Sequence, residues 1–85
     1  MHRWRNRLNH VLVFAGTGEG PAIARALLDS GHRVSVSVVS DAASRAYAEI
    51  PLHELHVGAF SPAPSLVDYL VARGVTLVVD ATHPF

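Results

Sequence analysis

The chain has 85 residues, of which 49% are hydrophobic, and its seven basic side chains balance seven acidic ones. This length supports one hydrophobic core at most, and we expect an incomplete one. Balanced charge argues against a nucleic-acid partner, and the absence of cysteine excludes a disulfide scaffold, a thiolate metal site and cysteine catalysis. Every apolar run is much shorter than the roughly 20 residues that span a membrane, so we expect a cytoplasmic protein without a membrane partner.

The first residues, MHRWRNR, are basic. They are not followed by the long apolar stretch and small-residue cleavage site of a signal peptide. We therefore expect residues 1–9 to form a solvated extension and residues 10–85 to form the folded, nucleotide-binding domain.

A strand followed by a helix is predicted at the start of this domain. The run HVLVFA at residues 10–15 is continuous, apolar and ended by glycine, which is typical of a strand buried on both faces of a parallel sheet. From Gly20 the pattern changes to helical spacing. Pro21 suits the first helical position, and Gly31 suits the C-terminal cap.

The next segments predict two further strands around a short helix. Residues 33–39 alternate valine and serine, which predicts the second strand and completes a β-α-β unit. Residues 42–50 predict a short helix that Pro51 interrupts. Residues 52–57 predict a third, weaker strand.

One more helix and one more strand follow. Ser65 is expected to cap the helix with Asp68 at its third position, and Gly74 is expected to end it. Residues 75–79 are strongly apolar and predict a last strand, which delivers the segment DATHPF at its carboxyl end.

This alternation of strands and helices predicts right-handed crossovers and a parallel sheet. We therefore expect an α/β, Rossmann-like open sheet with flanking helices and the strand order 3-2-1-4. Because the sequence stops directly after a strand, we expect an incomplete domain in which one edge or face of the sheet is uncovered.

A glycine loop, Gly16-Thr17-Gly18-Glu19-Gly20, lies between the first strand and the first helix, where a doubly wound sheet binds phosphate. Glycines allow positive φ angles and close approach of a ligand, and the free amides of a helix start favour a pyrophosphate. Thr17 offers a hydroxyl donor, and Glu19 is expected to face a ribose hydroxyl or to cap the helix. The loop lacks the Gly-Lys-Ser/Thr of a nucleoside triphosphatase, so we expect a dinucleotide ligand. The alternative is that the loop is only a tight turn.

Residues after the second strand commonly select between the dinucleotides. Asp41 favours the ribose hydroxyls of NAD, whereas Ser40, Ser44 and Arg45 favour the additional phosphate of NADP. These residues alone leave both cofactors open. A structural alternative assigns Ser40 or Asp41 to helix capping and leaves Arg45 in solvent.

The final loop contributes four candidate substrate-binding residues, namely Asp80, Thr82, His83 and Pro84. They follow the last strand at the sheet edge that carries the glycine loop, so we expect the two loops to be neighbours. Thr82 and His83 are candidate catalytic residues, because a histidine can donate a hydrogen bond or a proton near neutral pH and Thr82 can bind a carboxylate or phosphate. Asp80 can orient either of them. In the alternative interpretation Asp80 only holds loop amides, and His83 packs or meets water.

The other histidines do not predict a metal site. His53 and His56 are three residues apart, which places them on opposite faces of a strand, and no third ligand is evident. His32 is interpreted as a turn residue.

Four segments of the chain resemble the precorrin-6A reductase family in order and spacing. They are VLVFAGTGEG at residues 11–20, GHRVSVS at 31–37, VGAF at 57–60 and VDATHPF at 79–85. The last segment is the most restricted to that family. The resemblance covers nearly all of the chain after its first residues, although such reductases are roughly two or three times longer and contain a second α/β region.

The resemblance implies NADPH-dependent reduction of a ring double bond in precorrin-6A or cobalt-precorrin-6A, on the route to cobalamin. It implies that Gly16, Thr17, Gly18 and Glu19 form the cofactor loop. Ser40 falls near the adenosine ribose, and Thr82-His83-Pro84 match the loop beside the substrate cleft. Ala15 departs from a glycine that is common at its position. We expect this part alone to be inactive, since the second region is needed for turnover.

Two alternatives to a reductase remain open at this stage. A non-catalytic sensing module would bind a dinucleotide through the same glycine loop and regulate a partner. An inactive fragment would expose a sheet edge and bind no cofactor. A short-chain dehydrogenase is disfavoured because the chain has no lysine for a Tyr-x-x-x-Lys pair.

Overall fold

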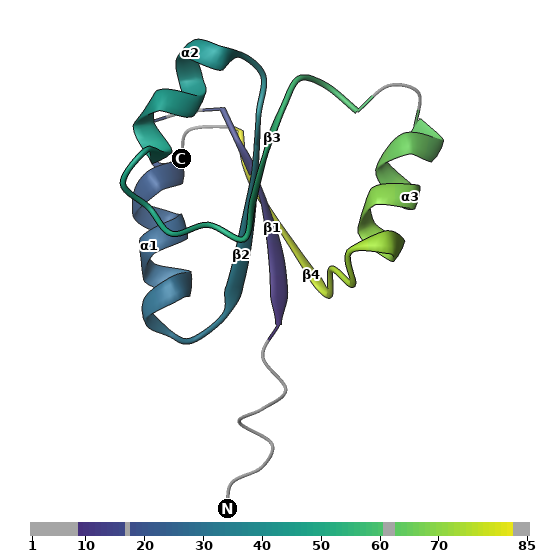
Figure 1. Ribbon diagram of the computed structural model, residues 1–85, viewed down its shortest axis with the longest axis horizontal. Coiled ribbons are helices and arrows are strands. Elements are labelled where there is room, and N and C mark those ends of the chain that lie inside the picture. Colours follow the sequence, from purple (N-terminus) through teal and green to yellow (C-terminus); the bar gives the residue numbers. More distant parts are fainter. Residues whose placement is uncertain (1–8, 17, 61–62, 83–85) are drawn as a thin grey trace, which may run out of the picture.

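The computed structural model describes residues 9–16, 18–60 and 63–82. These form four strands, three α-helices and one 3-10 turn. In chain order they are β1 (His10–Ala15), α1 (Gly20–Asp29), β2 (Arg33–Val38), α2 (Asp41–Ser44), η2 (Arg45–Tyr47), β3 (Glu54–Val57), α3 (Ala63–Ala72) and β4 (Leu77–Ala81). The strands are all parallel and have the order β3-β2-β1-β4 (Figure 1). The predicted Rossmann-like fold and the strand order 3-2-1-4 are confirmed.

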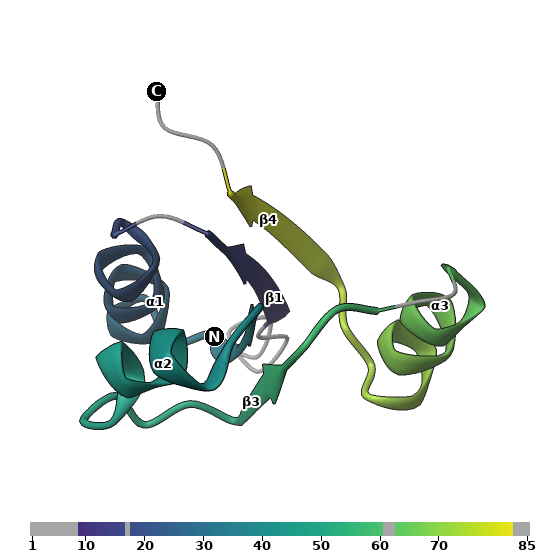
Figure 2. The ribbon, with the colours of Figure 1, turned by 90° about the horizontal axis from the view of Figure 1, so that it is seen from above.

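The helices lie in two layers, with α1 and α2 on one face of the sheet and α3 on the other (Figure 2). The first face carries the hydrophobic core. Alternate valines of β1 and β2 point into it and are fully or almost fully buried: Val11, Val13, Val34, Val36 and Val38. Ala24 of α1 packs against them with no exposed surface. The small side chain lets the helix approach the sheet closely.

The ends of α1 agree with the sequence prediction. Pro21 occupies the first turn, where its missing amide removes no helical hydrogen bond. Gly31 has a φ of 91° and follows the helix, and its amide donates to the Leu28 carbonyl over 2.9 Å. The His32 amide donates to the Leu27 carbonyl over 3.1 Å, which completes a glycine-based C-terminal cap.

Two boundaries in the second half of the chain were predicted wrongly. Helix α3 begins at Ala63, so Ser65 lies inside the helix and does not cap it. Proline in the first turn is tolerated, which allows the helix to include Pro64. Strand β4 spans Leu77–Ala81 and not residues 75–79. Where the chain enters the sheet, the Thr76 amide donates a hydrogen bond to the His10 carbonyl, and the strand begins after this contact.

The middle of the chain follows the prediction in outline. The helix expected at residues 42–50 consists of one turn of α2 followed by η2, and the third strand begins at Glu54, two residues later than expected. The second strand ends at Val38, one residue earlier than expected.

The edge strand β4 is incompletely covered, as expected. Leu77 and Val78 remain 45% and 44% exposed, and Val67 and Val71 of α3 are also exposed. None of the helices in the described part of the chain is long and apolar enough to cross a membrane.

The face of the sheet toward α3 is more polar and is organised by His10, which is only 3% exposed. Its Nδ1 lies 2.8 Å from the Arg73 carbonyl oxygen and its Nε2 lies 2.7 Å from Ser35 Oγ. Since a carbonyl only accepts, Nδ1 donates to Arg73. The imidazole therefore joins β1 to β2 and to the C-terminal end of α3.

We predict that His10→Ala lowers the free energy of unfolding by about 1–3 kcal/mol, because the buried Ser35 hydroxyl then loses its partner. Urea unfolding followed by circular dichroism measures the change. His53→Ala is the control, since it removes only an edge contact with the His10 ring, and it should change stability by less than about 0.5 kcal/mol. Equal effects of the two substitutions would contradict the assigned role of His10.

Candidate cofactor site

The glycine loop lies directly against the loop that follows β4. A Cβ at Gly16 would come within 3.1 Å of the Thr82 Cα. The Gly16 amide also donates to the Ala81 carbonyl over 3.4 Å. The expected proximity of the two loops is therefore confirmed, and it depends on the absence of a side chain at Gly16.

The other end of the glycine loop is closed by η2. Gly20 is buried, and a Cβ there would collide with the Tyr47 hydroxyl and would lie 2.9 Å from the Ala15 Cβ. Only glycine permits the first turn of α1 to lie this close to β1 and Tyr47.

The loop glycines act through their size and not through their backbone angles. Positive φ values occur at Gly31, Gly58 and Gly74, so the freedom to adopt such angles is not what Gly16 and Gly20 contribute to the loop. Gly18 is exposed, and a Cβ there would meet nothing within 4 Å. The backbone at Gly18 thus faces open space that a ligand can approach closely.

The start of α1 has the features of an anion site. The first helical hydrogen bond runs from the Ile23 amide to the Glu19 carbonyl over 3.1 Å, which leaves the amides before it for a ligand or water. The Glu19 side chain does not cap the helix, contrary to one of the two roles expected for it. Thr17 lies outside the described residues.

A pocket of about 330 Å³, here called the glycine-loop pocket, opens beside this helix start. It extends from Gly16 and Gly18, across Val38 and Val39 at the end of β2, to Ala43 of α2. The glycine loop and the turn after β2 therefore border one cavity. This is the arrangement in which a doubly wound fold holds the phosphates and ribose of a nucleotide.

The residues considered for cofactor selection have structural partners. Ser40 Oγ accepts a hydrogen bond of 3.1 Å from the Ala43 amide and so caps α2, as the structural alternative proposed. Arg45 lies 4.0 Å from the Asp41 carboxylate, and both side chains are highly exposed. Because Ser40 serves only as acceptor in the cap, its hydroxyl can still donate to a ligand.

In the final loop Asp80 holds Thr82. Asp80 Oδ1 accepts a hydrogen bond of 3.0 Å from the Thr82 amide and one of 2.5 Å from Thr82 Oγ1. Asp80 thus both orients its neighbour and holds a loop amide, which are the two alternatives considered for it. His83 and Pro84 lie outside the described residues.

The sequence analysis missed the importance of Tyr47, which was predicted only as part of a short helix. The side chain is 5% exposed, and its hydroxyl is buried without a hydrogen-bond partner among the described residues. Burial raises the pKa of Tyr47, so the phenol stays protonated. Its one sequence signal is that it is a lone aromatic residue in an otherwise small and polar segment, DAASRAYAE.

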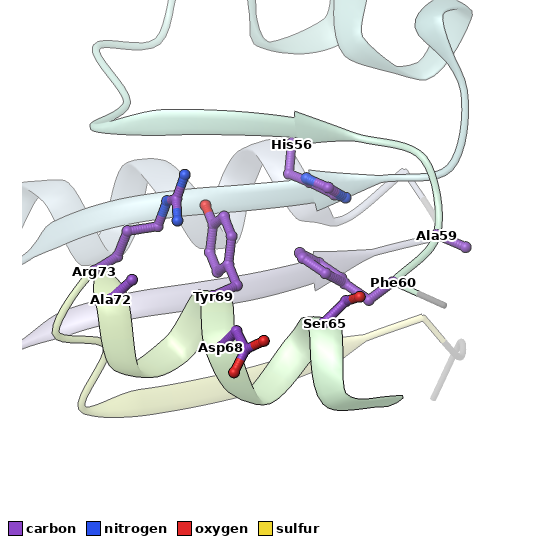
Figure 3. A pocket seen from close by; sticks show the side chains of 8 residues that line it. All are labelled: His56, Ala59, Phe60, Ser65, Asp68, Tyr69, Ala72 and Arg73. Atoms are coloured by element: carbon purple, nitrogen blue, oxygen red, sulfur yellow. The ribbon is translucent and has the colours of Figure 1, made fainter. Parts of the chain in front are cut away.

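A second cluster, also missed, joins β3 to α3, and its two members on the α3 side, Tyr69 and Arg73, are drawn in Figure 3. Arg73 Nε lies 2.7 Å from Glu54 Oε1, and Tyr69 Oη donates to the same oxygen over 3.0 Å. The Arg73 guanidinium also lies over the Tyr69 ring, 4.1 Å from its centroid. The hydrogen bond from Arg73 is the main cause that lowers the pKa of Glu54. We call these three residues the α3 clasp.

Beside the α3 clasp is an open pocket of about 510 Å³ between α3 and the end of β3. His56 lines it with its ring stacked on Phe60 at a centroid distance of 3.9 Å (Figure 3). The described residues contain no group of three or more histidines and carboxylates that could hold a metal ion. The pocket combines an aromatic wall with the charged side chains of Asp68 and Arg73.

Comparison with known proteins now adds to this geometry. The model of a family described as "Precorrin-6x reductase CbiJ/CobK" matches residues 10–85. The chain belongs to this family. The resemblance predicted from the sequence motifs is confirmed.

Individual members of the precorrin-6x reductase family are similar to nearly the whole chain. The precorrin-6A reductase of Rhodococcus erythropolis is 37% identical over 79 residues, which are 92% of this chain and 31% of that protein. The precorrin-6A reductase of Rhodobacter capsulatus is 35% identical over 78 residues, or 92% of this chain and 30% of that protein. The cobalt-precorrin-6A reductase of Synechocystis sp. is 32% identical over 78 residues, which are 88% of this chain and 28% of that protein. The chain therefore spans about 30% of the length of these relatives. No solved structure matches it significantly.

Gly20→Ala should destabilise the chain by about 1–3 kcal/mol, as overpacking does in a core, because the new methyl group meets the Tyr47 hydroxyl. Tyr47→Phe removes a buried hydroxyl that has no partner, so it should leave stability unchanged or raise it. In the double variant, Gly20→Ala should lower the free energy of unfolding by a smaller amount.

Urea unfolding of the two single variants and the double variant measures this coupling. Gly18→Ala is the matched control, since nothing lies within 4 Å of a Cβ there. Equal losses of unfolding free energy in Gly18→Ala and Gly20→Ala would contradict the assigned packing. The same holds if Tyr47→Phe does not reduce the loss caused by Gly20→Ala.

The α3 clasp should weaken in acid. Arg73 holds the pKa of Glu54 below its usual value of 4.5. The carboxylate therefore contributes fully to stability above pH 4.5, and this contribution is lost as the pH falls through the lowered pKa. Glu54→Gln should therefore reduce the dependence of unfolding free energy on pH below 4.5. Glu49→Gln, at an exposed carboxylate outside the clasp, serves as control. If Glu54→Gln and the unaltered chain had parallel pH curves, Glu54 would not be the responsible group.

Proposed function

We propose that this chain is the cofactor-binding part of an NADPH-dependent precorrin-6A reductase, which reduces a ring double bond of a precorrin macrocycle in cobalamin biosynthesis. The observation that carries the proposal is the glycine-loop pocket, where the start of α1, the open backbone at Gly18 and Val39 in the turn after β2 border one cavity. Family membership supplies the reaction class. A cytoplasmic location belongs to the same proposal.

The described residues fit the pyrophosphate and ribose of a dinucleotide. The backbone at Gly18 and the amides of Gly20 and Ala22 would bind the phosphates, because no side chain at Gly18 blocks the approach. Ser40 would donate its hydroxyl to the adenosine ribose. Arg45 would leave Asp41 and pair with a 2′-phosphate, which is the feature that favours NADPH over NADH.

The loop after β4 would position the substrate. Asp80 fixes Thr82 through two hydrogen bonds, so the Thr82 hydroxyl is held at the sheet edge beside Gly16. In the proposed enzyme Thr82, His83 and Pro84 contact the macrocycle, with His83 as a proton donor near neutral pH. When bound, NADPH supplies the hydride for the reduction.

Calorimetric titration of the folded chain with NADPH and NADH tests the cofactor assignment. We expect NADPH to bind more tightly than NADH. Gly18→Asp should abolish binding of both, because it places a carboxylate against the phosphates. Ala72→Asp adds the same charge on α3, away from the glycine-loop pocket, and should leave binding unchanged.

A further variant separates the two cofactors. Arg45→Ala should weaken NADPH and leave NADH unaffected, since only NADPH carries the 2′-phosphate. A folded chain that binds neither dinucleotide would contradict the assignment of the glycine-loop pocket. Equal losses for both cofactors in Arg45→Ala would contradict the role of Arg45.

A further inference from the structure

The open pocket of about 510 Å³ between α3 and the end of β3 has no role in the proposed cofactor and substrate contacts. We call it the aromatic pocket, because three ring side chains gather in it (Figure 3). The His56 ring stacks on Phe60 at a centroid distance of 3.9 Å, and the Tyr69 ring lies edge-on to both, 5.1 Å from Phe60 and 5.8 Å from His56. Tyr69 is buried, whereas His56 and Phe60 are only half-buried. These two rings therefore leave apolar surface open to an occupant.

The charged groups of the aromatic pocket favour a basic occupant. Arg73 is already bound to Glu54 through the α3 clasp, so its charge is neutralised. Asp68 also lines the pocket, and its exposed carboxylate has no ion-pair partner among the described residues. The pocket thus combines open ring surfaces with one unpaired negative charge. A flat apolar group beside a positive charge fits this combination.

The chain itself contains a segment with this chemistry. Residues 1–8, MHRWRNRL, hold the only tryptophan of the sequence, Trp4, between Arg3 and Arg5, and they contain no acidic residue. They lie outside the part of the chain that the structure describes. The match to the family model begins at residue 10, so this N-terminal segment is not among the features that the chain shares with that model. A role for it has to come from this chain's own surface.

The described residues place the N-terminal segment within reach of the aromatic pocket. His10 begins β1, and its Nδ1 donates to the carbonyl of Arg73, which lines the pocket, over 2.8 Å. An extended chain rises about 3.3 Å per residue, so the six steps from His10 to Trp4 span up to roughly 20 Å. The pocket follows α3 from Arg73 to Ser65, which is about 12 Å at 1.5 Å per residue. Trp4 can therefore enter the pocket without a movement of β1 or α3.

We propose that the N-terminal segment docks on the aromatic pocket of its own chain, with Trp4 inserted against the rings. The indole adds edge-to-face or offset contacts to the ring cluster, which aromatic side chains prefer. Its N–H finds an acceptor in the hydroxyl of Ser65 at one end of the pocket. Arg3 and Arg5 stay at the solvent-exposed rim and pair with Asp68. The segment then covers part of the sheet face beside α3, in contrast to the solvated extension that its composition alone predicts.

The fluorescence of Trp4 tests the proposal directly, because no other tryptophan contributes to the signal. We expect the folded chain to emit at shorter wavelength than N-acetyltryptophanamide and to be quenched several-fold less by acrylamide. Emission and quenching equal to those of the free compound would overturn the proposal. Light scattering follows the oligomeric state over the same concentrations. A blue-shifted emission that appears only as the chain dimerises would also overturn it, since the occupant would then come from a second copy.

A matched pair of substitutions on α3 identifies the docking site. Ala72→Arg places a long, positively charged side chain in the aromatic pocket and should shift the Trp4 emission to that of an exposed tryptophan. Val71→Arg adds the same side chain at the preceding residue, which is 76% exposed and does not line this pocket, and should leave the emission unchanged. Circular dichroism checks that both variants are folded. Equal emission of folded Ala72→Arg and the unaltered chain would show that Trp4 does not occupy the aromatic pocket.

Discussion

The close approach of backbone segments at the β1–α1 junction is the constraint on which the rest of the site depends. Gly20 has no side chain, so Tyr47 of η2 lies directly over the first turn of α1. Gly16 has none either, so the loop after β4 lies against the end of β1. These two contacts bring three loops from distant parts of the sequence to one edge of the sheet. A methyl group at Gly20 would collide with Tyr47, and one at Gly16 would require Thr82 to shift.

The two faces of the sheet are stabilised by different interactions, and this difference leaves room for a ligand. The face under α1 and α2 is a close-packed layer of valines. The face under α3 instead carries His10, Ser35 and Glu54, which form directional hydrogen bonds at the amino ends of the strands and at the C-terminal end of α3. At the carboxyl ends of the strands this face keeps a cavity of about 260 Å³, lined in part by Phe14 and Leu66. The polar contacts thus fix α3 at one end, and a cavity remains at the end where nucleotides bind in this class of fold.

The proposed function gives the turn after β2 a binding role beside its structural one. Ser40 uses an oxygen lone pair to cap α2 and retains its hydrogen for a ligand. The pair between Asp41 and Arg45 is highly exposed, and such pairs contribute little to stability. Arg45 can therefore move to a phosphate with little loss of stability. In the proposed function, the residues at this helix start would also select the cofactor.

The sequence by itself determined the order of the elements, the parallel sheet, its strand arrangement and the family resemblance. These properties follow from local features, namely the apolar runs, the glycine at the end of α1 and the motifs after β1 and β4. Local patterns also misled in two places, at the start of α3 at Ala63 and at the start of β4 at Leu77. The entry into β4 is set by the His10 carbonyl, which holds the Thr76 amide from 66 positions away.

Only the tertiary structure decided how the candidate site is built. Tyr47 over Gly20, Thr82 against Gly16 and the α3 clasp each join residues that no short motif connects. The role of the loop glycines belongs here too, since their φ values are ordinary and the need for glycine comes from neighbours across the fold. Periodicity reports which face of an element is buried, but it does not report which distant side chain lies against that face.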